Sequence, residues 1–254
     1  MRPAICDFFS LPDLQKTKNL LCIQPHPDDM EIGAGATIAR LSQTGTEISV
    51  LTVTDGAAGT YDPTMTADKL SEIRKKETRN SSDLLGVKEL FWLDFPDGGD
   101  LPYDLVRGEI TRVIRQVKPD GIMVCDPWLP YEVHTDHIRT GLAAAEAAFL
   151  ANMPNFCPAD LQDGLTPHAV ELIAFYYTAY PNTFIAAGDN WAVKLEAIGC
   201  HQSQFPPQKM EQLSALLTEK AKVYSKEETG KEPVEAFKVL SPSHLHIFEE
   251  AWRC

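Results

Sequence analysis

Positive charge is scarce in this sequence. Lysine and arginine number 23 against 36 aspartates and glutamates, which gives a formal net charge of −13 at pH 7. Nucleic acids and anionic membrane surfaces are bound through local positive charge, so this balance disfavours both as partners. A neutral small-molecule substrate fits the composition better.

Long apolar runs are also missing. No run approaches the ~18 residues that a membrane-spanning helix needs. Residues 1–7 lack the apolar core of a signal peptide. These absences predict a cytoplasmic protein without a membrane partner.

The cysteines follow no framework. They lie at positions 6, 22, 125, 157, 200 and 254, with no Cys-x-x-Cys pair. Such scatter disfavours a secreted disulfide scaffold and a cysteine-rich zinc ribbon, so we expect free thiols.

A Gly-x-Gly-x-x-Gly fingerprint is absent as well. The loop with Gly56 and Gly59 lacks that spacing, and we interpret it as a pocket wall rather than a phosphate cradle.

Strand-like and helix-like segments alternate along the 254 residues. The charged stretch 219–235 is expected to form a helix and loop near the surface. The alternating βαβα order is typical of an α/β fold, here one domain over residues 1–254. We expect a Rossmann-like, doubly wound, mostly parallel sheet with helices on both faces. Apolar runs predict strands at 20–23, 48–53, 90–93, 121–125 and 171–178, and helical spacing predicts helices at 31–43, 67–85, 103–117, 138–150 and 190–199.

Two histidine–aspartate clusters follow the first and fourth predicted strands. The first is Pro25-His26-Pro27-Asp28-Asp29, and the second is His134-Thr135-Asp136-His137. In a doubly wound sheet the strand order reverses beside the first strand, so the first and fourth strands become neighbours. We therefore expect both clusters to open into one crevice.

Together the clusters offer the ligands of a catalytic metal. Neutral imidazole and carboxylate oxygen suit a borderline ion such as Zn²⁺, which takes three protein ligands and keeps one position open. His26 and Asp29 are three apart at a helix start, so both can face one point. We assign His26, Asp29 and His137 as ligands, although such a set also accepts Fe²⁺, Co²⁺ or Mn²⁺. Alone, either cluster could instead be a polar turn at a helix entrance.

The two motifs resemble those of the PIG-L or LmbE-like family of zinc-dependent N-acetylglucosamine deacetylases. That family carries Pro-His-Pro-Asp-Asp after the first strand and His-x-Asp-His after the fourth. The resemblance extends over nearly the whole chain, and Thr135 replaces a proline common in the second motif. The segment 126–132 looks like the branch that acts on chitin disaccharides. Further shared stretches are Thr54-Asp55-Gly56, Leu85-Gly86-Val87 and His201-Gln202-Ser203-Gln204-Phe205.

The resemblance implies a role for each reactive group and one Zn²⁺ per subunit. Asp28 would be the general base that deprotonates the metal-bound water. His134 would stabilise the oxyanion or protonate the leaving amine. Asp136 lies between two histidines, and we expect it to orient His134 through the other ring nitrogen.

The resemblance also implies a sugar site and an assembly. Arg74 and Asp97 would bind the sugar, although Arg74 and Glu77 could instead form a surface ion pair. Trp128 is near enough to the second cluster to stack on a sugar face, and otherwise belongs to the core. His246 would reach an active site, that of its own or of a neighbouring subunit, within a homo-oligomer such as a hexamer.

The expected reaction is removal of acetyl from an N-acetylglucosamine unit, as in N,N′-diacetylchitobiose or short chitooligosaccharides. A deacetylase for another N-acetylglucosaminyl conjugate, a thiol or lipid precursor, is the alternative within the same class. From a different class, a non-catalytic Rossmann-like module for a sugar or nucleotide would hold no stoichiometric metal and would release no acetate.

Overall fold

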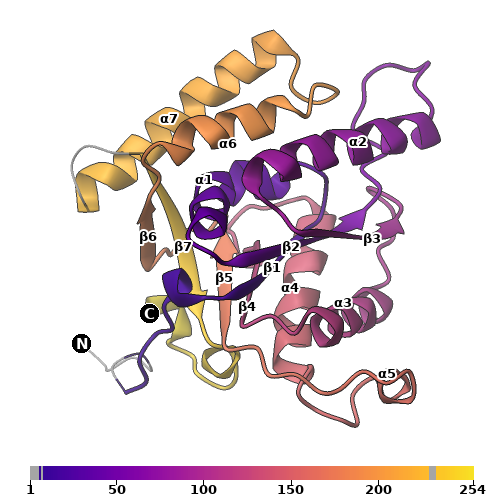
Figure 1. Cartoon of the computed structure of the whole chain (residues 1–254), viewed down its shortest axis with the longest axis vertical. Coiled ribbons are helices and arrows are strands. Elements are labelled where there is room, and N and C mark those ends of the chain that lie inside the picture. Colours follow the sequence, from indigo (N-terminus) through magenta and orange to yellow (C-terminus); the bar gives the residue numbers. More distant parts are fainter. Residues whose placement is uncertain (1–5, 7, 229–232) are drawn as a thin grey trace.

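A seven-stranded sheet organises the molecule, in the strand order β3-β2-β1-β4-β5-β7-β6 (Figure 1). The computed structural model describes residues 6, 8–228 and 233–254. Strands β1 to β5 run parallel, whereas β7 pairs antiparallel with both β5 and β6. The strands are β1 (Asn19–Gln24), β2 (Glu47–Thr54), β3 (Glu89–Phe95), β4 (Gly121–Cys125), β5 (Leu172–Tyr176), β6 (Thr183–Ala186) and β7 (Val234–Leu240).

Helices cover both faces of the sheet. In Figure 1, α1, α2, α6 and α7 lie above the sheet, and α3 and α4 lie below it. The helices are α1 (Asp29–Gln43), α2 (Ala67–Leu85), α3 (Tyr103–Val117), α4 (Thr135–Leu150), α5 (Ala159–Gln162), α6 (Asn190–Gly199) and α7 (Pro207–Glu228), and the 3-10 turns are η2 (Leu14–Lys16), η3 (Pro242–Leu245) and η4 (Ala251–Arg253). The predicted three-layer α/β class is confirmed. Among the described residues, no helix is long and apolar enough to cross a membrane.

Burial explains why the central strands are continuous apolar runs. Every residue of β4 and β5 is buried, and only the first residue of β1 is partly exposed. Parallel strands covered on both faces need apolar side chains in both directions, so alternation disappears. This layer gives the site a rigid base.

The chain places β1 beside β4, as the doubly wound prediction requires. Leu20, Leu21 and Cys22 pair with residues 121–123. Helices α1 and α4 begin earlier than predicted, at Asp29 and Thr135 rather than at residues 31 and 138. The reason is that residues of the two motifs themselves form the first helical turns.

The antiparallel end of the sheet was not predicted. The stretch 219–235 was expected at the surface as a helix and loop, and residues 229–232 of it lie outside the described residues. From residue 234 onward the chain enters β7, where Glu235 is buried against Lys194 at 2.5 Å. The Glu235 carboxylate also accepts the backbone N–H of Thr37 at 2.7 Å. Residues 219–228 form the end of α7, as the helix prediction expects, but the charge of Glu235 is neutralised inside the protein, which a sequence pattern does not reveal.

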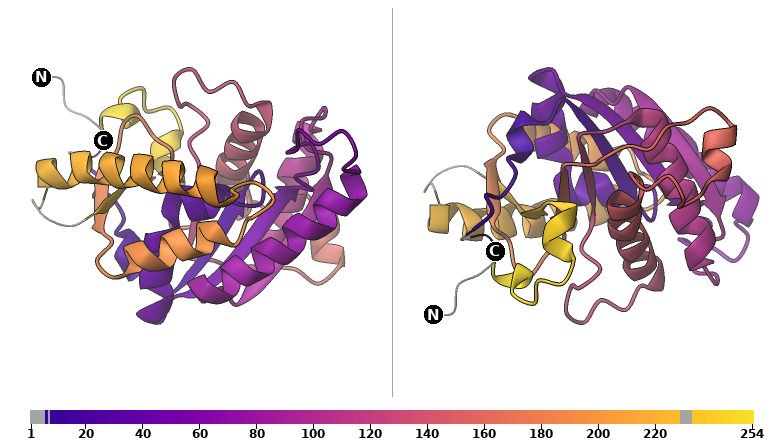
Figure 2. Two further views of the ribbon diagram at one scale, coloured as in Figure 1. Left: turned by 90° about the horizontal axis from the view of Figure 1, so that it is seen from above. Right: turned by 90° about the horizontal axis from the view of Figure 1, so that it is seen from below.

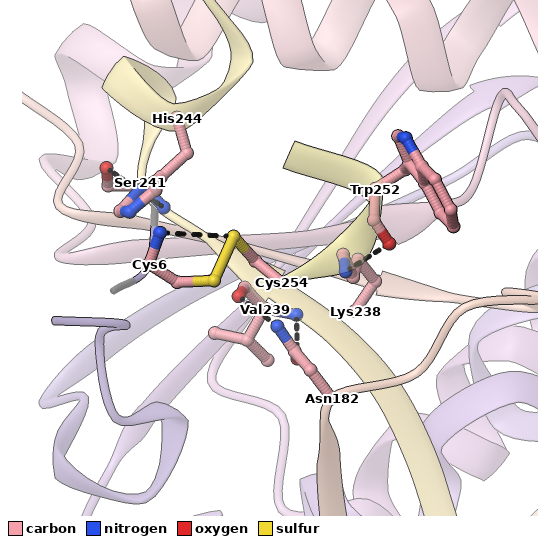
Figure 3. The surroundings of a disulfide bond; sticks show 8 residues. All are labelled: Cys6, Asn182, Lys238, Val239, Ser241, His244, Trp252 and Cys254. Carbon is pink, nitrogen blue, oxygen red and sulfur yellow. Dashed lines mark hydrogen bonds between the residues drawn. A yellow bond between two sulfur atoms is a disulfide. The ribbon is translucent and has the colours of Figure 1, made fainter. Parts of the chain in front are cut away.

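The prediction of free thiols is wrong for two cysteines. Cys6 and Cys254, separated by 248 positions, form a disulfide (Figure 3). Within the described chain, the free cysteines are Cys22, Cys125, Cys157 and Cys200. No spacing rule connects residues so far apart, because the pairing depends on both end segments meeting beside β7.

Candidate metal centre

The two histidine–aspartate clusters meet at the carboxyl ends of β1 and β4. His26 and Asp29 follow β1, and His137 lies in the first turns of α4. One ligand atom from each of these three side chains lies within 4.8 Å of the others. The two clusters therefore come together, as the strand order predicts.

Asp29 lies between the two histidine rings. Its Oδ2 is 3.1 Å from Nδ1 of His26, and its Oδ1 is 3.3 Å from Nε2 of His137. Imidazole nitrogens and carboxylate oxygens that converge on one point are the donor set of a catalytic divalent-metal site. The three residues therefore fit a metal ion.

A carboxylate lies close to the other nitrogen of each histidine ring: His26 is hydrogen-bonded there, whereas Nδ1 of His137 makes no hydrogen bond among the described residues. Nδ1 of His137 lies 3.3 Å from Glu132, and Nε2 of His26 lies 3.1 Å from Asp97 and 3.3 Å from Asp136. Such contacts fix the ring orientation and the tautomer of a metal-binding histidine. The sequence analysis missed Glu132, because it adjoins the second motif without belonging to it.

Asp97 and Asp136 contact a different partner from the one expected. Asp97 was predicted to bind sugar hydroxyls, and Asp136 was predicted to orient His134. In the structure both carboxylates lie against His26, and the N–H of Gly98 donates to Asp136 at 2.9 Å. Sugar binding by Asp97 and the orienting of His134 by Asp136 stay predictions. His26, Asp97, His134 and Asp136 also form a second group of potential metal ligands.

Electrostatics favour a dication in the first group. Burial lowers the pKa of His26, but hydrogen bonds to Asp136, Asp29 and Asp97 together raise it to about 12. Burial likewise lowers the pKa of His137, and Asp29 raises it above its ordinary value. Burial raises the pKa of Asp29, yet its hydrogen bonds to both histidines hold it well below the usual range. Metal binding would displace protons from these rings and keep the charge balanced.

Asp28 lies beside this group in a strained backbone conformation. Its φ of 111° belongs to the left-handed region, which costs a non-glycine residue on the order of 1–3 kcal/mol. The Arg74 guanidinium stabilises it by donating to Oδ2 of Asp28 at 3.0 Å and to the carbonyl of Pro27. Burial raises the pKa of Asp28 to about 7, although Arg74 opposes the rise. A carboxylate that titrates near neutrality is suited to general base catalysis.

The glycine loop packs on Arg74. Gly56 accepts a hydrogen bond from Nη1 of Arg74 at 2.9 Å, and a Cβ at Gly56 would lie 2.7 Å from the same nitrogen. Glu77 instead accepts from the N–H and hydroxyl of Ser203, at 2.7 and 2.6 Å. The surface ion pair considered for Arg74 and Glu77 does not form. A role of Arg74 in sugar binding remains a prediction. Its Nη1 and Nη2 atoms bind the protein here, whereas its Nε atom has no hydrogen-bond partner among the described residues.

His134 and Tyr177 complete the centre. The ring centroid of His134 is 4.4 Å from that of His26 and 5.0 Å from that of His137. Burial and these two neighbours lower the pKa of His134, so the neutral imidazole is favoured. The hydroxyl of Tyr177 donates to the carbonyl of Asp29 at 3.1 Å, and its ring stacks on His137 at 6.3 Å. Sequence reasoning missed Tyr177, which follows an apolar strand and belongs to neither motif.

Trp128 and His246 lie outside both ligand groups. Trp128 is 53% exposed, and its ring meets Phe175 edge-on at 5.6 Å. The exposed ring of His246 contacts Phe149 at 5.1 Å and shares a pocket with Trp128. Figure 2 shows the C-terminal segment, in yellow, beside α4. Their substrate-binding roles remain predictions.

The three-layer fold brings two histidines and an aspartate together at neighbouring strand ends, and a buried carboxylate lies beside them. This arrangement is that of a metal-dependent hydrolase. Comparison with known proteins narrows this class. Residues 21–148 match the PIG-L family, described as GlcNAc-PI de-N-acetylase. The chain belongs to the PIG-L family, and most of its named relatives are deacetylases.

Two relatives match along almost the entire chain. Diacetylchitobiose deacetylase of Thermococcus kodakarensis is 40% identical over 242 residues, covering 95% of this chain and 90% of its own length. The structure of N,N′-diacetylchitobiose deacetylase from Pyrococcus horikoshii, complexed with its inhibitor MPG, matches with a TM-score of 0.90 and 40% identity, covering 95% of this chain and 91% of that one. A 1D-myo-inositol 2-acetamido-2-deoxy-alpha-D-glucopyranoside deacetylase of Kineococcus radiotolerans is 32% identical over 173 residues, which is 56% of this chain and 48% of that protein.

Proposed function

We propose that this protein is a metal-dependent hydrolase that removes the acetyl group from an N-acetylglucosamine unit. The observation that carries this proposal is the joint placement of His26, Asp29 and His137 around one point, with Asp28 buried beside them. A non-catalytic binding module would not need a buried carboxylate with a pKa near 7 next to a metal-ligand set.

The ligands of the ion would be His26, Asp29 and His137, and Zn²⁺ is the proposed metal, one per chain. A bound divalent ion polarises the amide carbonyl and makes water more acidic. We favour this group over the one containing His134 and Asp136 because it has three members, which leaves one position open on a four-coordinate ion, whereas the other group has four. Each of its rings also has a carboxylate within 3.3 Å of the second nitrogen.

The chain's own residues would carry the proton transfers. Asp28 accepts the proton of the attacking water and can return it to the departing amine, because its pKa lies near neutrality. Arg74 holds Asp28 in position through the 3.0 Å contact. The neutral ring of His134 can donate a hydrogen bond to the developing oxyanion. Asp136 and Asp97 fix the ring of His26.

For the substrate we propose N,N′-diacetylchitobiose or a short chitooligosaccharide. The support is the identity of 40% over 95% of the chain to a protein named for that disaccharide. The inositol-linked sugar in the name of the Kineococcus relative represents the alternative conjugates, but that match spans only 56% of the chain. Rates of acetate release from the two types of substrate would rank them.

Metal analysis and an acetate assay test the mechanism together. We expect about one divalent ion per chain both in the unaltered protein and in Asp28→Asn, because Asp28 is not a ligand. Acetate release from N,N′-diacetylchitobiose should fall by at least ~100-fold in Asp28→Asn, since general base catalysis contributes about that much. Asp104→Asn, at an 86% exposed side chain, is the matched control. A chain that binds no metal, or an Asp28→Asn variant with full activity, would refute the mechanism.

Assembly and location remain predictions. A homo-oligomer in which His246 reaches a neighbouring active site is tested by solution mass measurement together with His246→Ala kinetics. A fully active monomer would reject it. The predicted cytoplasmic location is not supported by the Cys6–Cys254 disulfide, which favours an oxidising environment.

A further inference from the structure

A pocket that contains none of the candidate metal ligands lies between the loop that follows β4 and the C-terminal segment 241–254. Its volume is about 280 Å³, near the lower end of the range for small-ligand sites. Trp128 forms one wall, and Phe248 and Trp252 of the C-terminal segment form another. None of the proposed catalytic steps uses this pocket.

Two buried charges of opposite sign line the pocket without pairing. Asp126 is 7% exposed and Lys238 is 5% exposed. Among the ion pairs of the described residues, none within 4.0 Å joins these two side chains. Oδ1 of Asp126 accepts the N–H of Trp128 at 2.9 Å, and Lys238 donates one of its three N–H groups to the carbonyl of Trp252 at 3.0 Å. Hydrogen-bonding capacity on both groups is therefore left for a ligand.

The chemistry of the walls selects the ligand class. A hydroxyl group can donate to a carboxylate and accept from an ammonium group, so neighbouring sugar hydroxyls would satisfy Asp126 and Lys238 together. Aromatic side chains provide flat apolar surface for the C–H face of a sugar ring. Tyr180 and Trp252 are already locked edge-to-face at 5.7 Å, which limits the entropy lost on binding.

We propose that this pocket binds the sugar ring next to the N-acetylglucosamine unit that is deacetylated, with Lys238 and Asp126 as its hydroxyl-binding residues. The inference rests on the proposed function and names the part of the substrate that the metal centre does not hold. It makes the pocket a determinant of preference for a disaccharide over a single sugar.

Just beyond the ends of β4 and β5, residues that line the pocket are sequence neighbours of residues that contact the metal centre. Thr178 lines the pocket and directly follows Tyr177, whose ring stacks on His137. Asp126 directly follows Cys125, whose thiol contacts the carbonyl of His137 at 3.3 Å. Consecutive Cα atoms are ~3.8 Å apart, so at both places the backbone of the pocket wall lies one residue away from a residue in contact with His137.

The disulfide anchors one wall of the pocket. Figure 3 shows the Cys6–Cys254 bond close to the Lys238–Trp252 contact. The chain from β7 to Cys254 is thus held at both ends, by the sheet and by the disulfide. This anchoring limits the movement of the segment that carries Trp252.

Binding measurements in the Asp28→Asn variant test the proposal without turnover. Lys238→Met keeps the approximate length of the side chain but removes its donors. Its affinity for N,N′-diacetylchitobiose, measured by calorimetry, should be about tenfold lower, as expected for the loss of a charged hydrogen bond. The affinity for N-acetylglucosamine should change by less than about threefold, because that ring occupies the metal centre. Lys222→Met, at a lysine with a 55% exposed side chain on α7, is the matched control.

Each outcome decides the proposal. An equal loss of affinity for both sugars, or no loss of affinity for either, would overturn the proposal. Should Lys238→Met fail to fold, the isosteric Asp126→Asn takes its place with the same expectation. If the unaltered protein releases no acetate but its affinity for the disaccharide depends on Lys238, the proposed reaction is refuted and the proposed sugar site is supported. If acetate is released but the preference for the disaccharide is unchanged in the variant, only the proposed sugar site is refuted.

Discussion

Removal of the Cys6–Cys254 disulfide should cost this protein a large part of its stability. The bond closes a loop across 248 sequence positions. In the chain-entropy treatment, a cross-link over a loop of this length lowers the entropy of the unfolded chain enough to stabilise the fold by about 5 kcal/mol. A typical domain has an unfolding free energy of ~5–15 kcal/mol, so the contribution is substantial. We expect Cys254→Ser to lose between ~2 and ~5 kcal/mol.

The assay is guanidinium unfolding with and without a thiol reductant. The unaltered protein should be destabilised by the reductant to the level of Cys254→Ser, and the variant should not respond to it. Cys200→Ser, at a partly exposed free thiol, is the control and should behave like the unaltered protein. If the reductant leaves the unfolding midpoint of the unaltered protein unchanged, the disulfide does not stabilise the fold as predicted.

Three further predictions concern the two sites. Glu132→Gln should lower metal affinity by about 10- to 100-fold in a chelator competition, because the carboxylate orients His137; unchanged affinity would contradict that role. Arg74→Met should lower kcat with little change in KM and reduce the unfolding free energy by about 3–5 kcal/mol, since it leaves Asp28 buried without its counter-charge; a rise in KM alone would instead favour direct sugar binding. Burial lowers the pKa of Lys238 from 10.5 to about 8, and Asp126 opposes that shift. The folded chain therefore loses this proton at lower pH than the unfolded chain, and stability rises with pH between about 8 and 10.5. Lys238→Met should accordingly exceed the unaltered protein in stability by up to about 3 kcal/mol below pH 8, and this advantage should shrink toward pH 10.5. Asp126 and Glu249 are the other charged groups that line the pocket. Lys222→Met removes the same charge outside the pocket and serves as the control. A stability difference between Lys238→Met and the unaltered protein that does not change with pH would contradict the lowered pKa of Lys238.

Local signals explain why much of the fold was predictable. Helix α2 has its predicted limits because Thr66 caps its start and Gly86 takes the left-handed conformation that ends it. Strand β4 likewise matches the prediction, because an apolar run between turn residues has few alternatives. These features depend on neighbours in the sequence.

What escaped prediction depends on distant contacts. Strand β7 was missed because Glu235 looks solvated in sequence, whereas Lys194 neutralises it inside the protein. The contact of Asp136 with His26 spans 110 positions and could not be chosen over a contact with nearby His134. The ligand set was accessible from spacing, but the groups that orient each ring required the three-dimensional arrangement.

The loop between β4 and α4 joins chemistry and recognition in one short segment. It carries Asp126 and Trp128 on the pocket side, and Glu132 and His134 on the metal side. Exchanging this loop to alter the accepted sugar would therefore also disturb the residues that position and complete the metal centre. The C-terminal segment contributes walls to the pocket without contributing metal ligands. Directed evolution of new substrate ranges should succeed more readily there.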